Sequence, residues 1–297
     1  MSYNVLGGVP PNDWFPLIDP AELDPMAREP GIVAKIRHVN PDIAGLQEFR
    51  PELPSGQQMM RDLADYTWLQ PDVPSPEPVA IPLLWRTSRF DRVDSGFEKI
   101  TSAADGCSGT LERYASWAKL RDKDTGRTIV AVNAHLCPFQ TAQSAAVRSA
   151  SIDRVVALID RIDPGLSDPF VLTGDFNTPS TENRPIFRDP SAKLVAAGLV
   201  DTKNAAAKDV SDVPRAGSYN GMQASVHGTD RAKAIRRTDR HMDYVWTPKH
   251  AQVATWATVS GPGVAWRTIA GTKVPVWTGV IPSDHSPVVA KVTFPRA

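Results

Sequence analysis

Apolar runs that stop at a polar side chain recur along this chain and predict buried β-strands. The clearest begins at Phe170 and leads into Thr173-Gly174-Asp175-Phe176-Asn177. A continuous apolar run is typical of a strand buried on both faces. Further strands are expected at 2–6, 43–48, 79–86, 242–246 and 288–294, with a hairpin that joins 113–121 to 127–136. Pro82 places the 79–86 strand at a sheet edge or a bulge.

Apolar residues spaced by three and four predict helices over 30–39, 57–68 and 143–162, each with one apolar face. A shorter helix is expected near 191–197, ended by Gly198. The remaining stretches are expected to be loops: a proline-rich segment at 71–78, a polar and basic one at 202–241, and a long one at 261–282 that holds Trp266 and Trp277.

Length and composition indicate one globular unit. The 297 residues contain no segment that resembles a linker, so a single domain over 1–297 is expected. With 41% hydrophobic residues, the longest apolar runs fall far short of the roughly 20 residues that a membrane span needs. The formal net charge is zero, so no global field indicates a polyanionic partner, although a local basic patch can bind one. We expect a monomer.

The chain has two cysteines, Cys107 and Cys137. A disulfide between them requires the first hairpin arm to bulge or the preceding loop to fold back; otherwise both are ordinary thiols. No basic and apolar leader precedes Tyr3. The protein is therefore expected to be either cytoplasmic or secreted with its leader absent from this chain, and we favour the second.

Polar side chains mark the ends of the expected strands. Taken singly, such endings are also typical of Asx turns, solvated strand ends and core histidines. Their recurrence changes the interpretation, because groups at the strand ends of layered sheets converge on one cleft. The residues concerned are Asn4, Glu48, His135, Asp175, Asn177, Asp243, Asp284 and His285.

These motifs together resemble the endonuclease/exonuclease/phosphatase superfamily of deoxyribonuclease I-like enzymes. The resemblance lies in Tyr3-Asn4-Val5-Leu6, Leu46-Gln47-Glu48, Asn133-Ala134-His135-Leu136, Gly174-Asp175-Phe176-Asn177, Asp243-Tyr244 and Ser283-Asp284-His285. It spans nearly the whole chain and follows the order of motifs in the family. It implies an α+β fold: a four-layer α/β/β/α sandwich of two mostly antiparallel sheets flanked by helices.

The expected chemistry is the hydrolysis of a phosphoester with a divalent cation. A phosphodiester anion repels a nucleophile, so a cation that neutralises charge is needed. Mg²⁺ takes oxygen ligands and keeps much of its water shell, and Mn²⁺ or Ca²⁺ is the alternative. Glu48 is the best ligand candidate with Asn4 supporting it, as the resemblance also implies, and Asp284 is a further candidate.

The resemblance also implies roles for the other residues. Asp175 matches the residue that orients or deprotonates the attacking water, and Asn177 can donate its amide to the developing oxyanion. His285 is expected at the phosphate, with Asp243 holding its ring and favouring the imidazolium. His135 is expected on the opposite flank, where a protonated imidazole could serve the leaving oxygen. The sequence leaves open which of the two histidines is the acid.

The sequence leaves the substrate open. The basic segment from Arg215 to Arg240 and Arg50, which follows Glu48 closely, favour a nuclease-like phosphodiesterase acting on nucleic acid. The loop with Trp266 and Trp277 suits either stacking on bases or peripheral contact with a lipid surface. Tyr219 and Asn220 are further candidates for substrate binding, in a segment where some relatives carry a histidine. The alternatives are a sphingomyelinase-like or small-molecule phosphoesterase or phosphatase, and a non-catalytic binding protein on the same scaffold.

Overall fold

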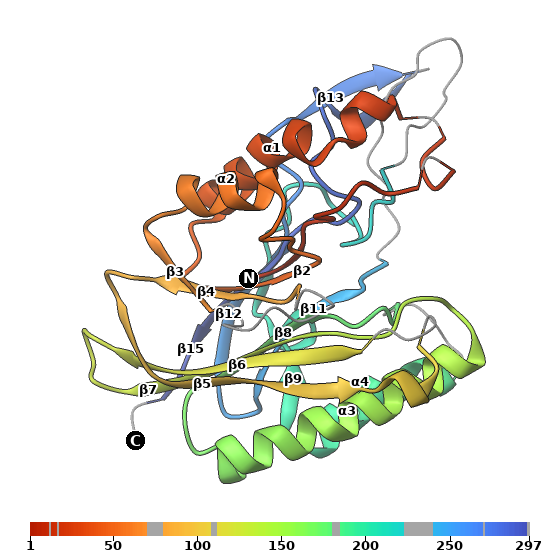
Figure 1. The fold of residues 1–297 in the computed structure, drawn as a ribbon. Coiled ribbons are helices and arrows are strands. Elements are labelled where there is room, and N and C mark those ends of the chain that lie inside the picture. The colour runs from red at the N-terminus through yellow and green to blue at the C-terminus, as the bar shows by residue number, and fades with distance from the viewer. Residues whose placement is uncertain are drawn as a thin grey trace.

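Two β-sheets pack face to face between outer layers of helices in the computed structural model of this protein (Figure 1). The structure describes residues 1–11, 13–16, 18–69, 80–107, 112–179, 185–222, 240–269 and 271–295. The expected proline-rich loop at 71–78 lies outside these residues. No helix in the described ranges is long and apolar enough to cross a membrane.

The first sheet has the strand order β10 (Lys208–Asp209), β12 (Gln252–Thr258), β15 (Val288–Thr293), β1 (Ser2–Asn4), β2 (Ile43–Gln47), β4 (Leu83–Arg86) and β3 (Tyr66–Leu69). The second has the order β5 (Phe90–Thr101), β6 (Arg113–Asp122), β7 (Thr128–His135), β8 (Phe170–Asp175), β11 (Asp243–Pro248) and β9 (Leu199–Asp201). Neighbouring strands are antiparallel except in the pairs β1–β2, β10–β12 and β7–β8.

Helices cover the outer face of each sheet (Figure 1). The helices are α1 (Pro25–Val39), α2 (Pro54–Asp62), α3 (Ala142–Ile162), α4 (Pro185–Ala196) and α5 (Thr202–Ala205), with 3₁₀ turns η1 (Pro20–Leu23), η2 (Ala103–Asp105) and η3 (Pro164–Leu166). Ile32 and Ile36 of α1 pack on Leu46 of the first sheet. On the second sheet, Ile152 of α3 packs in one core with Leu172. The expected four-layer sandwich is therefore confirmed.

A buried polar contact joins the two sheets behind their strand ends. Gln47 Nε2 donates to Asn133 Oδ1 at 2.7 Å, and Thr173 Oγ1 donates to the same oxygen at 3.2 Å. The sheets approach so closely here that a Cβ on Gly45 would lie 2.0 Å from Thr173 Oγ1. Glycine is needed at this point because the side chains of Thr173 and Asn133 occupy the space that a Cβ would take. The contact holds the ends of β2, β7 and β8 together.

The disulfide that the sequence left open is present between Cys107 and Cys137, with the Cα atoms 5.7 Å apart. After β5 the chain enters η2 and then turns back at Gly106, whose φ is +75°. Glycine adopts this left-handed conformation without a steric penalty. The fold-back loop therefore brings Cys107 to the end of β7.

Several expected elements are confirmed and others need correction. The hairpin at 113–136 and the helix over 143–162 are confirmed by β6, β7 and α3. The helix expected over 57–68 is wrong at both ends: α2 covers Pro54–Asp62 and residues 66–69 form β3. β4 is also not an edge strand, since it lies between β2 and β3. Pro82 precedes β4, so the missing N–H of this proline falls at the strand entrance.

Two segments expected to be loops are structured. Residues 261–282 contain the hairpin of β13 (Val264–Ile269) and β14 (Thr272–Trp277). In the polar stretch 202–241, residues 216–218 and 220–222 are buried, because they pack beneath the site instead of lying in solvent. Half of the Lys and Arg residues of that stretch, at 231, 233, 236 and 237, lie outside the described residues. The structure thus leaves the expected phosphate-binding role of that stretch untested.

Candidate active site

Polar residues from five strands lie at one edge of the sandwich. β1 ends at Asn4, Glu48 follows β2, β7 ends at His135, β8 ends at Asp175 and β11 begins at Asp243. Parallel pairing of β7 with β8 sets His135 opposite Asp175, and antiparallel pairing sets Asp243 opposite the same residue. Asp175 is therefore the centre of the cluster.

Asp175 is buried and held by two hydrogen bonds. Its Oδ1 accepts from the N–H of Asn177 at 2.8 Å, and its Oδ2 accepts from Nδ2 of Asn4 at 3.0 Å. The same Oδ2 lies 3.6 Å from Nε2 of His135 and 3.7 Å from Nε2 of His285. Burial raises the pKa of Asp175 to about 7. A carboxyl group that titrates near neutral pH is suited to accept a proton.

His285 is held as a cation. Its Nδ1 lies 2.7 Å from Oδ2 of Asp243, within a hydrogen bond. Burial alone would lower the pKa of His285, but the charges of Asp243, Asp284 and Asp175 outweigh it and raise this pKa well above 6.5. The ring of Tyr219 meets the imidazole edge-on, with the centroids 5.1 Å apart.

His135 differs from His285 in its charge state. Burial lowers its pKa well below 6.5, and the positive charge of Arg113 lowers it further. The ring is therefore neutral, which differs from the protonated His135 inferred from the sequence. Nδ2 of Asn177 lies 3.2 Å from His135 Nε2 and donates to the carbonyl of Leu136 at 3.1 Å. The amide expected to meet an oxyanion is thus turned to this histidine and its neighbour.

A second group of oxygen ligands lies beside Asp175. Asn4 Nδ2 donates to Glu48 Oε1 at 2.9 Å, while Asn4 Oδ1 accepts from the N–H of Leu6. The side chain of Glu48 is 37% exposed and lines the cleft. Asp284 is buried, and burial together with the charge of Glu48 raises its pKa to about 6. A divalent cation bound beside these carboxylates would offset the repulsion that Asp284 meets.

Asp175, Asp243 and His285 form another possible metal site, because one ligand atom from each lies within 4.8 Å of the others. The hydrogen bond between His285 and Asp243 engages Nδ1 of the histidine and Oδ2 of the carboxylate with each other. Mg²⁺ prefers oxygen ligands. The trio therefore suits proton transfer better, and the pair Glu48 and Asp284 suits the cation better.

Arg28 supports this edge of the site and was not identified from the sequence, which placed it outside the helix expected over 30–39. Its buried guanidinium donates to the carbonyls of Leu6, Gly8 and Pro282 at 2.6, 2.8 and 3.1 Å. These carbonyls belong to the segments that follow Asn4 and precede Asp284. Nothing in the local pattern distinguishes Arg28 from a surface arginine, so only the fold reveals this role.

A cleft with a volume of about 720 Å³ opens over the cluster. Arg50 and Tyr219, two of the expected substrate-binding residues, line it. Asn220 does not: it is buried and its Nδ2 donates to the carbonyl of Ser283 at 3.1 Å. Trp277 does not line the cleft either, because it is 6% exposed in an apolar core and packs on the ammonium of Lys35 at 4.6 Å.

Other cleft residues were missed by sequence reasoning. They are aromatic or basic and come from loops and from β6. Trp14, Arg113, Tyr114 and Phe139 are the principal ones, and Arg240, which the sequence placed in the basic segment, lines the cleft with them. Only Phe139 carried a signal, since it follows His135 closely in the chain. Trp266, considered beforehand as a stacking residue, is 47% exposed but is not among the residues that line the cleft.

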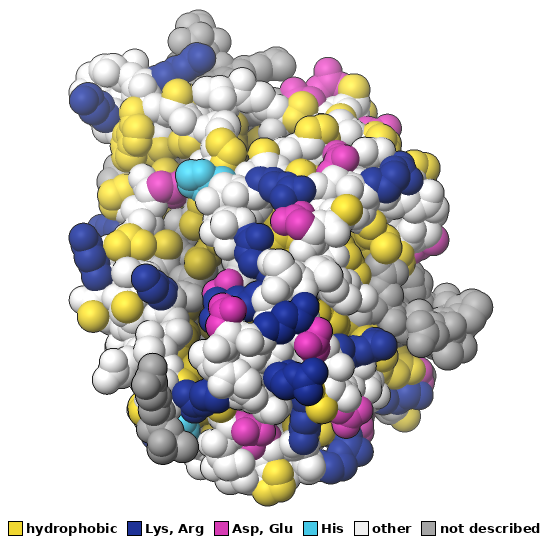
Figure 2. All heavy atoms as spheres, turned by 90° about the vertical axis from the view of Figure 1, so that its left-hand side faces the viewer, with side chains coloured by type: hydrophobic (Ala, Val, Ile, Leu, Met, Phe, Trp, Pro, Cys, Tyr) yellow, Lys and Arg dark blue, Asp and Glu magenta, His cyan; other side chains and the backbone are white. Residues whose placement is uncertain are grey.

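Figure 2 shows the face that lies on the left-hand side of Figure 1, and this face carries charges of both signs. Lys and Arg side chains there are interspersed with Asp and Glu. At the β6–β7 turn, which lies at the left of Figure 1, Arg121 and Lys123 both pair with Asp91. This face therefore has no continuous basic surface among the described residues.

The two-sheet sandwich and the carboxylate and imidazole groups at its strand ends define the deoxyribonuclease I-like class of phosphoesterases. The chain belongs to the Endonuclease/Exonuclease/phosphatase family, whose model it matches over residues 1–285. No curated protein matches it by sequence.

Solved structures share its fold at low sequence identity. A mannosyl-6-phosphatase from Bacteroides thetaiotaomicron superposes with a TM-score of 0.73 at 20% identity, covering 99% of this chain and 98% of that chain. TDP2 of D. rerio, complexed with single strand DNA product, superposes with a TM-score of 0.62 at 15% identity, covering 98% and 97%. The human Nocturnin catalytic domain gives 0.57 at 20% identity, covering 90% and 86%.

Proposed function

We propose that this protein is a divalent-metal-dependent phosphodiesterase with a nuclease-like site. The observation that carries the proposal is the position of Asp175 Oδ2, 3.6 and 3.7 Å from the Nε2 atoms of His135 and His285. A proton acceptor set between a neutral and a cationic imidazole is what the hydrolysis of an anionic ester needs.

The charge state of each residue determines its role in the proposed reaction. Asp175, with a pKa of about 7, accepts the proton of the attacking water. His285 holds a positive charge against the phosphoryl oxygens and, as the protonated histidine, is the better proton donor to the leaving oxygen. His135 and Asn177 line the opposite flank with a neutral ring and an amide. The sequence left open which histidine is the acid, and this proposal gives that role to His285.

Glu48 and Asp284 would hold the cation, with Asn4 orienting Glu48. A cation bound there would neutralise charge on the phosphoryl group and act as a Lewis acid. Mg²⁺ suits a site of few carboxylates, and Mn²⁺ and Ca²⁺ remain to be compared.

Three arginines favour a substrate with negative charge. Arg50, Arg113 and Arg240 line the cleft and approach it from different elements. Guanidinium groups bind phosphate oxygens in a planar, bidentate geometry. This supports a nucleic-acid-like diester over a neutral lipid tail as the group that fills the cleft.

The test is a substrate panel with each metal ion. Purified protein is assayed with Mg²⁺, Mn²⁺ or Ca²⁺ on bis(p-nitrophenyl) phosphate, p-nitrophenyl phosphate, plasmid DNA, single-stranded RNA and sphingomyelin. Cleavage of diesters is expected. Faster cleavage of the monoester would indicate a phosphatase, and faster cleavage of sphingomyelin would indicate a lipid phosphodiesterase. If no substrate is cleaved with any of the ions, the proposal that this protein is an enzyme is wrong.

Two variants with matched controls test the residue roles. Asp175→Asn and His285→Ala are each expected to lower kcat about 10²-fold or more, the usual contribution of a positioned acid or base. Asp160→Asn and His250→Ala change the same residue types at exposed positions and should retain wild-type rates. Wild-type turnover in either site variant would contradict the proposed mechanism.

A further inference from the structure

The loop between β7 and α3 presents an aromatic side chain to the cleft. Pro138, Phe139 and Gln140 all line it. Phe139 is 51% exposed, and its φ is +72°. A bulky residue seldom adopts this left-handed conformation, and such residues persist only where their surroundings hold them. The left-handed backbone of Phe139 therefore requires contacts that hold it in this conformation.

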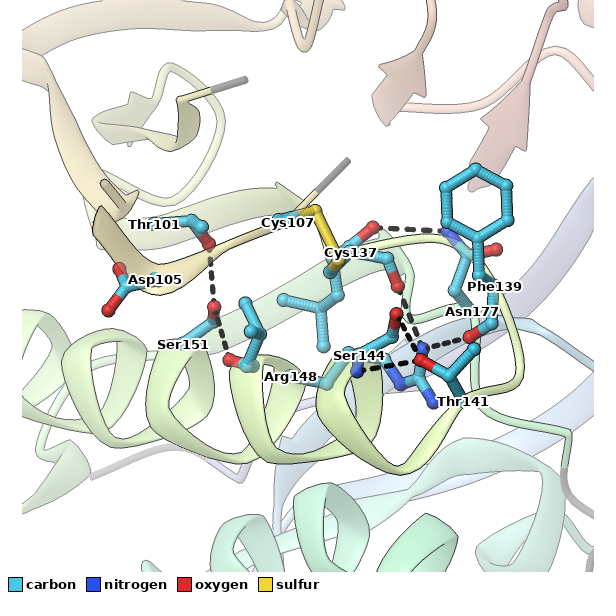
Figure 3. Close-up of a disulfide and its surroundings, with 12 residues drawn as sticks. Thr101, Asp105, Cys107, Cys137, Phe139, Thr141, Ser144, Arg148, Ser151 and Asn177 are labelled. Carbon is cyan, nitrogen blue, oxygen red and sulfur yellow. Dashed lines mark hydrogen bonds between the residues drawn. A yellow bond between two sulfur atoms is a disulfide. The ribbon is translucent and has the colours of Figure 1, made fainter. Parts of the chain in front are cut away.

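A disulfide, Arg148 and Gln140 fix the loop, and Figure 3 shows the disulfide and the Arg148 contacts. The Cys107–Cys137 disulfide holds one end. The buried Arg148 of α3 donates from Nη1 to the carbonyl of Cys137 at 2.9 Å and to that of Phe139 at 2.7 Å. Gln140 Nε2 donates to the carbonyl of Asn177 at 2.9 Å. The ring of Phe139 points away from α3 in this view. The loop is thus preformed.

Exposed apolar side chains gather at this cleft. Among the large apolar residues that are exposed in the described ranges, Val9, Trp14 and Phe139 line it, at 66%, 58% and 51% exposure. Val9 and Trp14 belong to the segment after β1, so the cleft has apolar walls from two separate parts of the chain. Exposed apolar side chains gathered in one cleft are typical of a binding site. Arg113 and Arg240 add positive charge to the same cleft.

We propose that Phe139 and Trp14 form a subsite for a planar ring carried by the phosphoester, so that the substrate is an aryl or nucleobase-bearing ester. The proposal rests on the proposed function, since it takes the cleft to hold a phosphoester. A rigidly held aromatic side chain stacks on a planar face, and arginines beside it match the phosphate that a ring-bearing ester also carries. A flexible alkyl chain gains less from a fixed ring.

Phosphonates that cannot be hydrolysed test the subsite without turnover. Binding of phenylphosphonate, methylphosphonate and octylphosphonate is measured by calorimetry with Mg²⁺ present. We expect phenylphosphonate to bind roughly 5- to 100-fold more tightly than methylphosphonate, the usual range for stacking on an aromatic side chain. Octylphosphonate binding as tightly as phenylphosphonate would overturn the assignment to a ring.

Variants at Phe139 test the residue itself. Glycine adopts a φ of +72° freely, so Phe139→Gly removes the ring without adding backbone strain. This variant should lose about 10-fold of the phenyl preference and keep methylphosphonate affinity, whereas Phe139→Tyr should keep both. If Phe139→Gly fails to fold, Trp14→Ala is measured for the same ratio. Trp266→Ala removes an exposed aromatic outside the cleft and should bind like wild type.

The outcomes separate this inference from the proposed function. An unchanged phenyl-to-methyl ratio in Phe139→Gly and Trp14→Ala, or an equal loss for both phosphonates, overturns the subsite whatever the enzyme cleaves. Ring-selective binding in a protein that cleaves none of the panel substrates refutes the proposed function and leaves the subsite standing.

Discussion

Nδ1 of His285 lies 2.7 Å from Oδ2 of Asp243, although the two residues are 42 positions apart in the sequence. The contact joins the loop before β15 to the first residue of β11. It fixes the ring so that Nε2 faces Asp175 at 3.7 Å. The charge of Asp243 also helps to raise the pKa of His285 well above 6.5.

Replacing Asp243 by asparagine should move the pH dependence. The neutral amide removes a charge that favours the imidazolium, so the pKa of His285 falls and the cation is lost at a lower pH. The alkaline limb of kcat/KM against pH is therefore expected to shift to lower pH in Asp243→Asn, and kcat to fall about 10²-fold. An unshifted limb would show that His285 does not act as a cation.

Asn4 links the expected cation ligand to the proton acceptor, because its amide donates to both Glu48 and Asp175. Residues that orient ligands typically contribute about 10- to 100-fold in metal affinity or activity. The Mg²⁺ concentration for half-maximal activity should rise by this factor in Asn4→Ala, and calorimetry of Mg²⁺ binding should show the same change.

Asn204→Ala is the control for Asn4→Ala, because this amide contacts Asp201 away from the cleft. Chelation of the metal should abolish turnover in wild type and in the control. Turnover that persists in excess chelator contradicts the need for a cation.

The Cys107–Cys137 disulfide closes a loop with a sequence separation of 30. Such a cross-link stabilises mainly by restricting the unfolded chain. The Cys107→Ser/Cys137→Ser variant should therefore have a free energy of unfolding about 3 kcal/mol lower in urea. Adding reductant to wild type should give a similar loss, and reductant should leave the variant unchanged. Equal stability with and without the bond would mean that the hydrogen bonds of Arg148 and Gln140 hold the loop without the disulfide.

Gly45 sits where the sheets are closest. A Cβ there would lie 2.0 Å from Thr173 Oγ1 and 2.5 Å from Asn133 Oδ1. Gly45→Ala should therefore lower the free energy of unfolding by about 1–3 kcal/mol, the usual cost of overpacking. Gly279→Ala is the control, because a Cβ there has no atom within 4 Å among the described residues. A stable Gly45→Ala would show that the sheets can separate at little cost.

The sequence by itself determined the class of fold and most of the cluster at the strand ends. Buried strands such as β8 read as apolar runs, and the polar residue that stops each one is visible in the chain. Prediction from the sequence failed where the pattern of apolar residues is weak. Residues 264–277 read as a loop because their strands form a separate two-stranded sheet that is only partly buried.

Only the tertiary structure decided the neutral state of His135 and the surroundings of the site. His135 and His285 both adjoin apolar strands in the sequence, yet their pKa values shift in opposite directions. Burial, aided by the charge of Arg113, lowers the pKa of His135, whereas the charges of Asp243, Asp284 and Asp175 outweigh burial and raise that of His285. Burial of Trp277 and exposure of Phe139 are likewise invisible in the chain. A pKa or an exposed fraction is set by atoms close in space, and a linear sequence does not specify which those are.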